Sequence, residues 1–402
     1  WMREEAWRRI GHLYPRAQLP DGSEATVIAW IWARTVTCPN PACGIETPLV
    51  SKWWLGKKKG KEAYIVPKVV GDHVEYSIGH DPKRAPTKQD DGTVDRNGAR
   101  CLACEAHIGF DYLRSEARSG RMGAELTAIA VEGRGSRTYL PPDRAHAAMA
   151  LRAVPSSVPV GDLPEAALGF RVQAYGMLKY SDLFSSRQLT ALTTFSDLVG
   201  ETRERVLRDA LAGGMSKGER LEAGGVGAAA YADAIATYLG LVISRITDYS
   251  SSINSWASSP QMEIVQHIFG RQALPMAWDY AESNPFADSS GSLNIMIRAV
   301  SGAVSRVPAC SQAYVLQTDA ASHDYRGSVI STDPPYYDNI GYSDLSDFFY
   351  VWLRRSLKDI HPSLFSTMLV PKAEELVANQ YRHGGRDGAR DFFENGFRTV
   401  FA

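Results

Sequence analysis

The sequence predicts an α/β fold in which part of a Rossmann-like sheet carries an inserted cysteine-bearing module and a helical region. Three observations lead to this prediction. First, a β-branched run at 329–332 is followed by Asp333, two prolines and then an amphipathic pattern at 342–357, the strand–turn–helix order of such a sheet. Second, two short-spaced cysteine pairs bracket strand-like segments within 35–110. Third, long amphipathic patterns at 185–212 and 231–255 predict two helices that pack together.

Composition bounds the size and class of the protein. Its 402 residues are enough for two or three folding units, and a hydrophobic fraction of 44% allows a sizeable core. The formal net charge of −1 excludes a basic field over the whole molecule, so any nucleic-acid surface must be local. No uncharged apolar run is long enough to span a membrane, and no secretory signal opens the chain. These features predict a cytoplasmic protein with no membrane partner.

The chain divides into four predicted parts. They are a helical lead-in, a module with the cysteine pairs, a mostly helical region and a C-terminal segment with the Pro-Pro turn, at 1–34, 35–110, 111–300 and 301–402. The chain starts at Trp1 rather than Met and ends in an amphipathic pattern at Ala402. We therefore expect both ends to be cuts inside a longer protein.

Two cysteine pairs predict a structural zinc site. Short-spaced pairs on turns supply four thiolates in a tetrahedron, and a complete thiolate set leaves no open position for chemistry. The alternative is four reduced cysteines without a metal, because disulfides are disfavoured in a cytosolic chain. His80 or His107 could also replace one of the cysteine ligands. Cys310 is isolated and is predicted to be a core thiol. The members of the two pairs are Cys38, Cys43, Cys101 and Cys104.

Between the cysteine pairs lies a tract that combines lysines with two adjacent tryptophans. This chemistry suits phosphate contact and base stacking, so the tract is a candidate nucleic-acid surface. A solvated hairpin tip is the alternative, and a strand is expected at 64–70, directly after it. The candidate nucleic-acid-binding residues are Lys52, Trp53, Trp54, Lys57, Lys58, Lys59 and Lys61.

The rest of the chain up to the Pro-Pro turn reads as helices with few strands. A helix is expected at 111–132, although Gly120 and Gly123 weaken it. The remaining expectations are strands at 138–140 and 314–316, a Pro-rich linker at 155–164, a glycine-rich connector at 213–227 and a helix at 292–304.

The turn after 329–332 carries the chemistry that we expect of this protein. Pro334 cannot continue a sheet, so the turn places Asp333 and Tyr336 at the carboxyl end of a predicted strand, where open α/β sheets bind ligands. Transfer to an adenine amino group needs acceptors for its two N–H bonds. The Asp333 carboxylate and the carbonyl of Pro334, held extended by Pro335, can provide them. Tyr336 offers a face on which a flipped base could stack.

The same residues resemble a known family. Asp333-Pro334-Pro335-Tyr336 matches the catalytic motif of S-adenosylmethionine-dependent amino-methyltransferases that act on DNA. The continuation at 337–355, with 269–276 and 369–376, resembles the zinc-ribbon-containing adenine-specific DNA methylases of bacteria and archaea. The resemblance runs along nearly the whole chain. It implies a DNA adenine-N6 methyltransferase with a partial methyltransferase sheet, S-adenosylmethionine as cofactor and a structural Zn²⁺.

The resemblance also implies what this stretch of sequence lacks. Such enzymes hold the cofactor with a glycine-rich loop after their first strand, and no segment here matches that loop. In the family the loop precedes the zinc insertion, so we expect it upstream of Trp1. Asp319 is then a candidate contact to the cofactor's adenine, and 111–300 is a candidate target-recognition region. We expect this chain alone to have little or no activity.

Other functions stay open at this point. A zinc-ribbon nucleic-acid-binding or scaffold protein with a vestigial transferase half would bind zinc and DNA but no cofactor. Cytosine-N4 transfer is the nearest enzymatic variant, and RNA or a protein amide are further possible substrates of the motif. For the family, DNA is the expected partner, together with other subunits of a phage defence or restriction-modification system.

Overall fold

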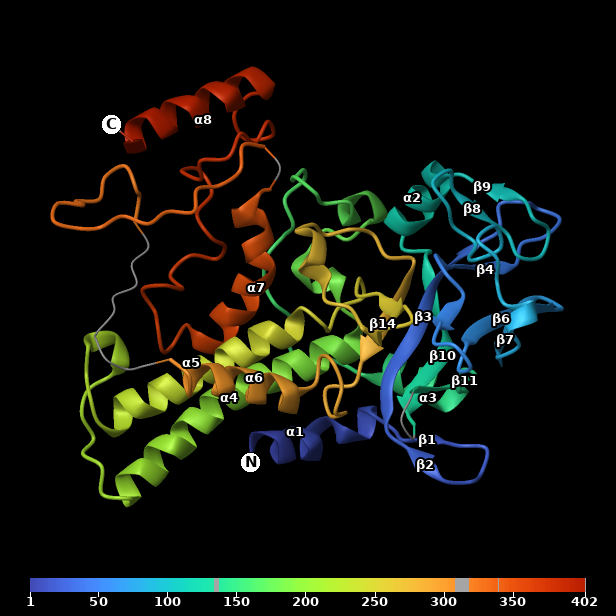
Figure 1. Cartoon of the computed structure of the whole chain (residues 1–402), viewed down its shortest axis with the longest axis horizontal. Helices are drawn as coiled ribbons and strands as arrows, with labels where there is room; N and C mark the ends of the chain where they lie inside the picture. The colour runs from blue at the N-terminus through green and yellow to red at the C-terminus, as the bar shows by residue number, and fades with distance from the viewer. Residues whose placement is uncertain (134–136, 308–317, 339, 402) are drawn as a thin grey trace.

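The computed structural model describes residues 1–133, 137–307, 318–338 and 340–401. The predicted strand at 314–316 and Cys310 lie outside these ranges. Figure 1 shows a β-rich part, which holds the small sheets, beside a layer of long helices.

A central antiparallel sheet joins these two parts. Its strands run in the order β11 (Arg137–Leu140), β10 (Gly123–Glu132), β3 (Val27–Thr37) and β14 (Asp279–Ser283), and β4 (Glu46–Leu49) pairs with the end of β3. All of these pairings are antiparallel. The sheet is therefore not the parallel sheet of a Rossmann fold, and the α/β expectation holds only as a mixture of helices and several small sheets.

The length and composition of β3 explain its central place. Aromatic and β-branched residues fill the run, and nearly all of its side chains are buried. Trp30 and Trp32 point into the core on the helical side, whereas Ile28 and Ile31 belong to a second core on the side of the cysteine-bearing module. The sheet thus separates two hydrophobic cores.

Short antiparallel sheets make up the rest of the β-rich part. The strand predicted at 64–70 is confirmed as β6, the middle strand of a three-stranded sheet. The strand expected at 138–140 is confirmed as β11. The small strands are β1 (Ala17–Gln18), β2 (Glu24–Ala25), β5 (Trp54–Gly56), β6 (Ala63–Val70), β7 (His73–Gly79), β8 (Ala99–Arg100), β9 (His107–Ile108), β12 (Trp256–Ser258) and β13 (Glu263–Val265).

Long helices pack on the other face of the central sheet (Figure 1). The helix expected at 185–212 is confirmed, and it starts with a capping box between Ser185 and Gln188. The helix expected at 292–304 is confirmed, with Ser292 as its N-cap. The helices are α1 (Met2–Ile10), α2 (Phe110–Arg118), α3 (Arg144–Arg152), α4 (Ser186–Ala212), α5 (Ala228–Thr247), α6 (Leu293–Val304), α7 (Tyr342–Leu357) and α8 (Arg386–Phe401). Short 3-10 turns lie at Gly11–Leu13, Pro82–Arg84, Val172–Tyr175, Tyr180–Leu183, Leu221–Ala223 and Ile268–Arg271.

Helix α5 is the one helix of the described residues that is long and apolar enough to cross a membrane by composition. It contacts α4, α6 and α7, and half of its most apolar window is buried inside the protein, as in a core helix. The helix expected at 231–255 ends earlier, at Thr247, because the polar residues after it form a turn. There the Asn254 side chain donates to the carbonyl of Asp248 at 2.8 Å.

Two predicted elements are wrong. The helix expected at 111–132 stops at Arg118, the chain turns at Gly120 with a φ of +69°, and the β-branched stretch that follows becomes β10. The run at 329–332 forms no strand, and its side chains are exposed. A strand needs a neighbour for its N–H and C=O groups, and no strand of the described residues lies beside this run.

The predicted division of the chain also differs from the observed elements. The boundary between 34 and 35 falls inside β3. The region expected to be mostly helical contributes β10, β11 and β14 to the central sheet as well as the long helices.

Candidate metal centre and the Asp-Pro-Pro-Tyr segment

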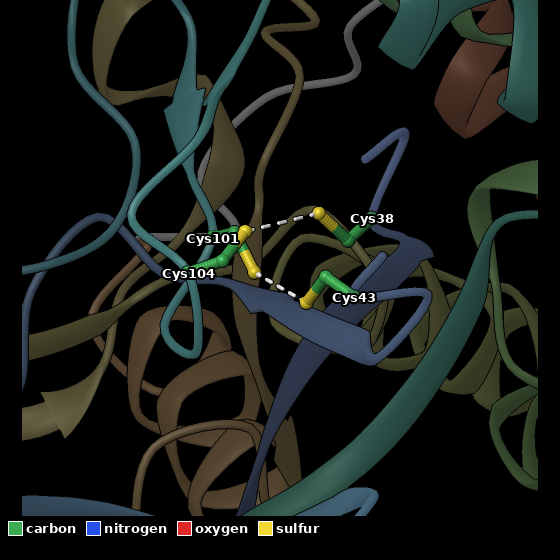
Figure 2. Close-up of side chains that lie close together, drawn as sticks. All are labelled: Cys38, Cys43, Cys101 and Cys104. Atoms are coloured by element: carbon green, nitrogen blue, oxygen red, sulfur yellow. Dashed lines mark hydrogen bonds between the residues drawn. The ribbon is translucent and has the colours of Figure 1, made fainter. Parts of the chain in front are cut away.

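Four cysteine sulfurs converge at one point of the β-rich part. The four Sγ atoms lie within 4.8 Å of one another and face a common centre (Figure 2). Cys38 Sγ lies 3.6 Å from Cys104 Sγ, and Cys43 Sγ lies 3.8 Å from Cys101 Sγ. Zinc–sulfur bonds of about 2.3 Å in a tetrahedron separate the sulfurs by about 3.8 Å. The thiols therefore already stand at the spacing of a Zn²⁺ site.

Backbone turns between short strands place these cysteines. Cys38 follows β3, and its N–H donates to the carbonyl of Ile45 at 2.8 Å, which closes the first loop. In the same way, the N–H of Cys101 donates to the carbonyl of Ala106 at 3.0 Å after β8. The residue after each second cysteine has a positive φ, +62° at Gly44 and +59° at Glu105. The two loops are thus similar knuckles that meet around the sulfurs.

The surroundings of the thiols differ in how they affect ionisation. Burial raises the pKa of Cys38 to about 12, whereas a hydrogen bond from the backbone N–H of Ala106 lowers the pKa of Cys104 to about 7. Binding of a divalent cation requires thiolates, so a metal would displace the proton of Cys38. Four soft sulfur donors in a closed tetrahedron fit Zn²⁺ in a structural role.

The two candidate histidine ligands lie outside the sulfur cluster. His80 Nδ1 lies 2.8 Å from the carbonyl of Glu62, and His107 Nε2 lies 3.3 Å from the carbonyl of Asn97. Among the described residues, the group that could hold a metal ion consists of the four cysteines.

The lysine–tryptophan tract forms β5 and the hairpin loop after it. Lys52, Lys58, Lys59 and Lys61 are exposed, as phosphate contact requires. Trp53 is buried in the module core, and Trp54 is half-buried with its indole N–H on the carbonyl of Pro86. Lys57 Nζ lies 5.0 Å from the centre of the Trp54 ring. The lysines thus lie on the surface as expected, whereas the tryptophans are not both available for stacking.

The tetrapeptide Asp333–Tyr336 lies on an irregular exposed segment before α7. Asp333 and Pro334 are exposed, Pro335 is half-buried, and 60% of the Tyr336 surface is accessible. Tyr337 anchors the segment, because its carbonyl accepts the N–H of Ala378 at 2.7 Å and its ring packs edge-on against Phe393. The tetrapeptide therefore presents a carboxylate and an aromatic ring to solvent at the start of a buried helix.

A charged network, which sequence reasoning missed, holds the start of α7. Asp344 and Asp347 are buried, and each carboxylate meets one cation at 2.5 Å, Arg382 for Asp344 and Lys372 for Asp347. Glu375 accepts from the backbone N–H of Ser343 at 2.7 Å and so caps the helix from a distant segment. Burial raises the pKa of both aspartates, which these cations oppose. The sequence feature that indicates this network is the spacing of Asp344 and Asp347, which puts both carboxylates on one face of an otherwise apolar helix.

The candidate cofactor residue, Asp319, lies apart from these features. It is exposed, and its carboxylate accepts the N–H of Ala321 at 3.0 Å in a local turn. Neither described cavity is lined by Asp319 or Asp333. These two cavities therefore lie away from both the tetrapeptide and the candidate cofactor residue.

Comparison with known proteins adds no relative. No protein-family model, no curated protein and no solved structure matches the chain.

Proposed function

We propose that this chain is part of an S-adenosylmethionine-dependent DNA methyltransferase that acts on the adenine amino group. The observation that carries the proposal is the tetrapeptide Asp333–Tyr336, presented in front of helix α7 with its carboxylate and ring exposed. The Asp333 carboxylate and the Pro334 carbonyl accept the two amino hydrogens of a flipped adenine. Such positioned acceptors act without a strong general base.

The polar network at the start of α7 supports a structural role for Asp344 and Asp347 and leaves the substrate contact to Asp333. Asp344 and Asp347 are buried and paired with Arg382 and Lys372, so they hold α7 in place. Asp333 has no hydrogen-bond partner among the residues that the structure describes and is free to meet a substrate. The proposal further requires cofactor-binding residues and strand neighbours for 329–332, neither of which is among the residues that the structure describes.

The test is a methyl-transfer assay on the product of the intact open reading frame. Mass spectrometry of duplex DNA should detect N6-methyladenine, and Asp333→Ala should lower its rate of formation by about 100-fold or more. Asp324→Ala is the matched control, because Asp324 is an exposed aspartate paired with Arg326 on the same segment. The proposal fails if Asp333→Ala methylates like the wild type. N4-methylcytosine as the product would instead assign the cytosine variant.

One observation favours a second candidate, a zinc-ribbon DNA-binding or scaffold protein. The cysteine cluster is fully assembled within this chain, whereas 329–332 forms no strand. This candidate expects zinc and salt-sensitive DNA binding, but no binding of S-adenosylmethionine by the full-length protein. Isothermal titration of that protein with the cofactor separates the two candidates.

A further inference from the structure

A polar groove lies where the cysteine-bearing module meets a hairpin from far along the chain. Its volume is about 480 Å³. The β5–β6 loop contributes Lys58, β11 contributes Arg137, the β12–β13 turn contributes Gln261, and β13 contributes Glu263. The indole N–H of Trp256 on β12 donates to the carbonyl of Leu55 on β5 at 2.8 Å, which ties the two hairpins together. The groove is thus a built feature of the fold.

A tight turn presents lysines at one wall of this groove. The N–H of Lys61 donates to the carbonyl of Lys58 at 2.9 Å, and Gly60 supplies the positive φ of +77° that the turn needs at its third position. Lys58, Lys59 and Lys61 are exposed, and none of them has a carboxylate oxygen of the described residues within ion-pairing distance. The turn therefore exposes a cluster of lysines whose nearest acid in the groove, Glu263, acts on Lys58 and Lys61 through its charge without an ion pair.

Arg137 adds a positioned guanidinium to the lining of the groove. Arg137 Nε donates to the carbonyl of Glu263 at 3.3 Å, and its Nη2 donates to Ser289 Oγ at 3.2 Å. These bonds orient the side chain without neutralising it. The acid that lines the groove is Glu263, which is half-buried. Its carboxylate packs against Gly56 at the start of the β5–β6 loop, so closely that a Cβ added to Gly56 would lie 2.5 Å from Oε1.

We propose that this groove and the lysine turn bind the phosphodiester backbone of duplex DNA. The choice of DNA rests on the function proposed above. Contact with the backbone, rather than stacking of single-stranded bases, follows from the tryptophans, since Trp53 is buried and Lys57 lies over the ring of Trp54. A loop without a free aromatic face can recognise phosphates but cannot serve as a stacking platform.

Fluorescence anisotropy with a labelled 20-base-pair duplex, the zinc-loaded 402-residue chain and no cofactor tests the proposal. The double variant Lys58→Ala/Lys61→Ala should weaken binding by about tenfold and reduce the slope of log K against log [salt] by about 2. Glu263→Gln should strengthen binding, because it removes a negative charge from the groove. Lys217→Ala is the matched control, an exposed lysine in the distant α4–α5 connector.

Zinc content and circular dichroism of each variant verify folding. Unchanged affinity and salt slope in the double variant would overturn the proposal, as would a wild-type chain that binds no duplex. Tighter binding of a single-stranded 20-mer that Trp54→Ala abolishes would overturn it in favour of base stacking. Because the assay measures binding without methyl transfer, its result stands apart from the outcome of the Asp333→Ala experiment.

Discussion

At the scale of single residues, backbone conformation decides how well the metal site is formed. Each knuckle has a positive φ at the residue after its second cysteine. Gly44 adopts this conformation at no steric cost, whereas Glu105 adopts it at the cost of a contact between its Cβ and the backbone. The sequence Cys43-Gly44 thus carries a local signal that spacing alone does not use. The positive φ at Glu105 means that the second knuckle holds backbone strain that the first avoids with Gly44.

Gly44→Ala is expected to destabilise the chain by about 1 kcal/mol and to lower its zinc affinity, because alanine is strained at a φ of +62°. The free energy of unfolding in urea and a competitive zinc titration measure the two effects. Gly200→Ala is the matched control. Gly200 lies within α4, and a Cβ there would meet no other atom. Alanine at this position should therefore increase the free energy of unfolding, by about 1 kcal/mol at most. Equal effects of both substitutions would contradict the role of φ.

At the scale of elements, a buried ion pair fastens α4 to the central sheet. Arg187 on α4 and Glu282 on β14 are almost fully buried, and the carboxylate accepts from the guanidinium Nε at 3.0 Å and Nη2 at 2.8 Å. The guanidinium also lies 3.9 Å from the ring centre of Trp30 on β3. The pair therefore links the long helix to two strands at once.

Removal of one partner leaves the other buried and uncompensated, so Glu282→Ala should destabilise the protein by about 3 kcal/mol or more. Asp197→Ala breaks the exposed pair with Arg355 and should cost less than about 1 kcal/mol. Chemical denaturation followed by circular dichroism compares the two variants. A cost for Glu282→Ala as small as that for Asp197→Ala would show that the pair adds nothing to the packing.

A second buried carboxylate makes the contact between α4 and α5 sensitive to pH. Burial opposes ionisation of Asp233, but hydrogen bonds from Arg220 and Arg203, at 2.6 Å each, outweigh it and hold the pKa of Asp233 below its usual 3.8. A carboxyl group with a lowered pKa stabilises the fold above its unfolded-state pKa. That contribution is lost as the pH falls through the folded-state pKa.

Asp233→Asn should therefore cost about 3 kcal/mol at pH 7, and the difference from the wild type should shrink as the pH is lowered below 3.8. Urea denaturation across this pH range measures the difference. Asp209→Asn, which removes the exposed partner of Arg205, should have an effect of less than about 0.5 kcal/mol at every pH. A pH-independent cost of Asp233→Asn would mean that packing rather than charge is lost.

At the scale of the whole molecule, β3 couples two cores that differ in what holds them together. The core on the helical side is built from α1, α4, α5, α6 and α7, whereas the core of the cysteine-bearing module surrounds Cys38 and Cys101. A small module with few regular elements depends on its metal more than a layer of long helices does. The two sides should therefore respond differently to metal removal.

A chelator should loosen the module and leave the helical layer folded. Hydrogen exchange followed by mass spectrometry should show lost protection at 38–49 and 99–108, where the knuckles and their strands lie, and retained protection in α4 and α5. Restored protection after Zn²⁺ is added back is the control. Simultaneous loss of protection throughout the chain would show instead that the two cores unfold as one unit.

The sequence by itself determined the features that depend on local chemistry. Helix α7 starts and ends where the amphipathic pattern predicts, α4 follows its capping box, and the four cysteines assemble as their spacing indicates. Periodicity, caps and short ligand spacings act between residues close in the chain, so a single sequence can reveal them.

Only the tertiary structure decided what depends on distant partners. The stretch that begins at Gly123 becomes a strand because β3 lies beside it, whereas the β-branched run at 329–332 has no such neighbour among the described residues. Trp53 is buried by the module core, and Asp344 finds its cation in Arg382. Strand pairing, burial and ion pairing all require groups that are brought together by folding, and no local pattern names those groups in advance.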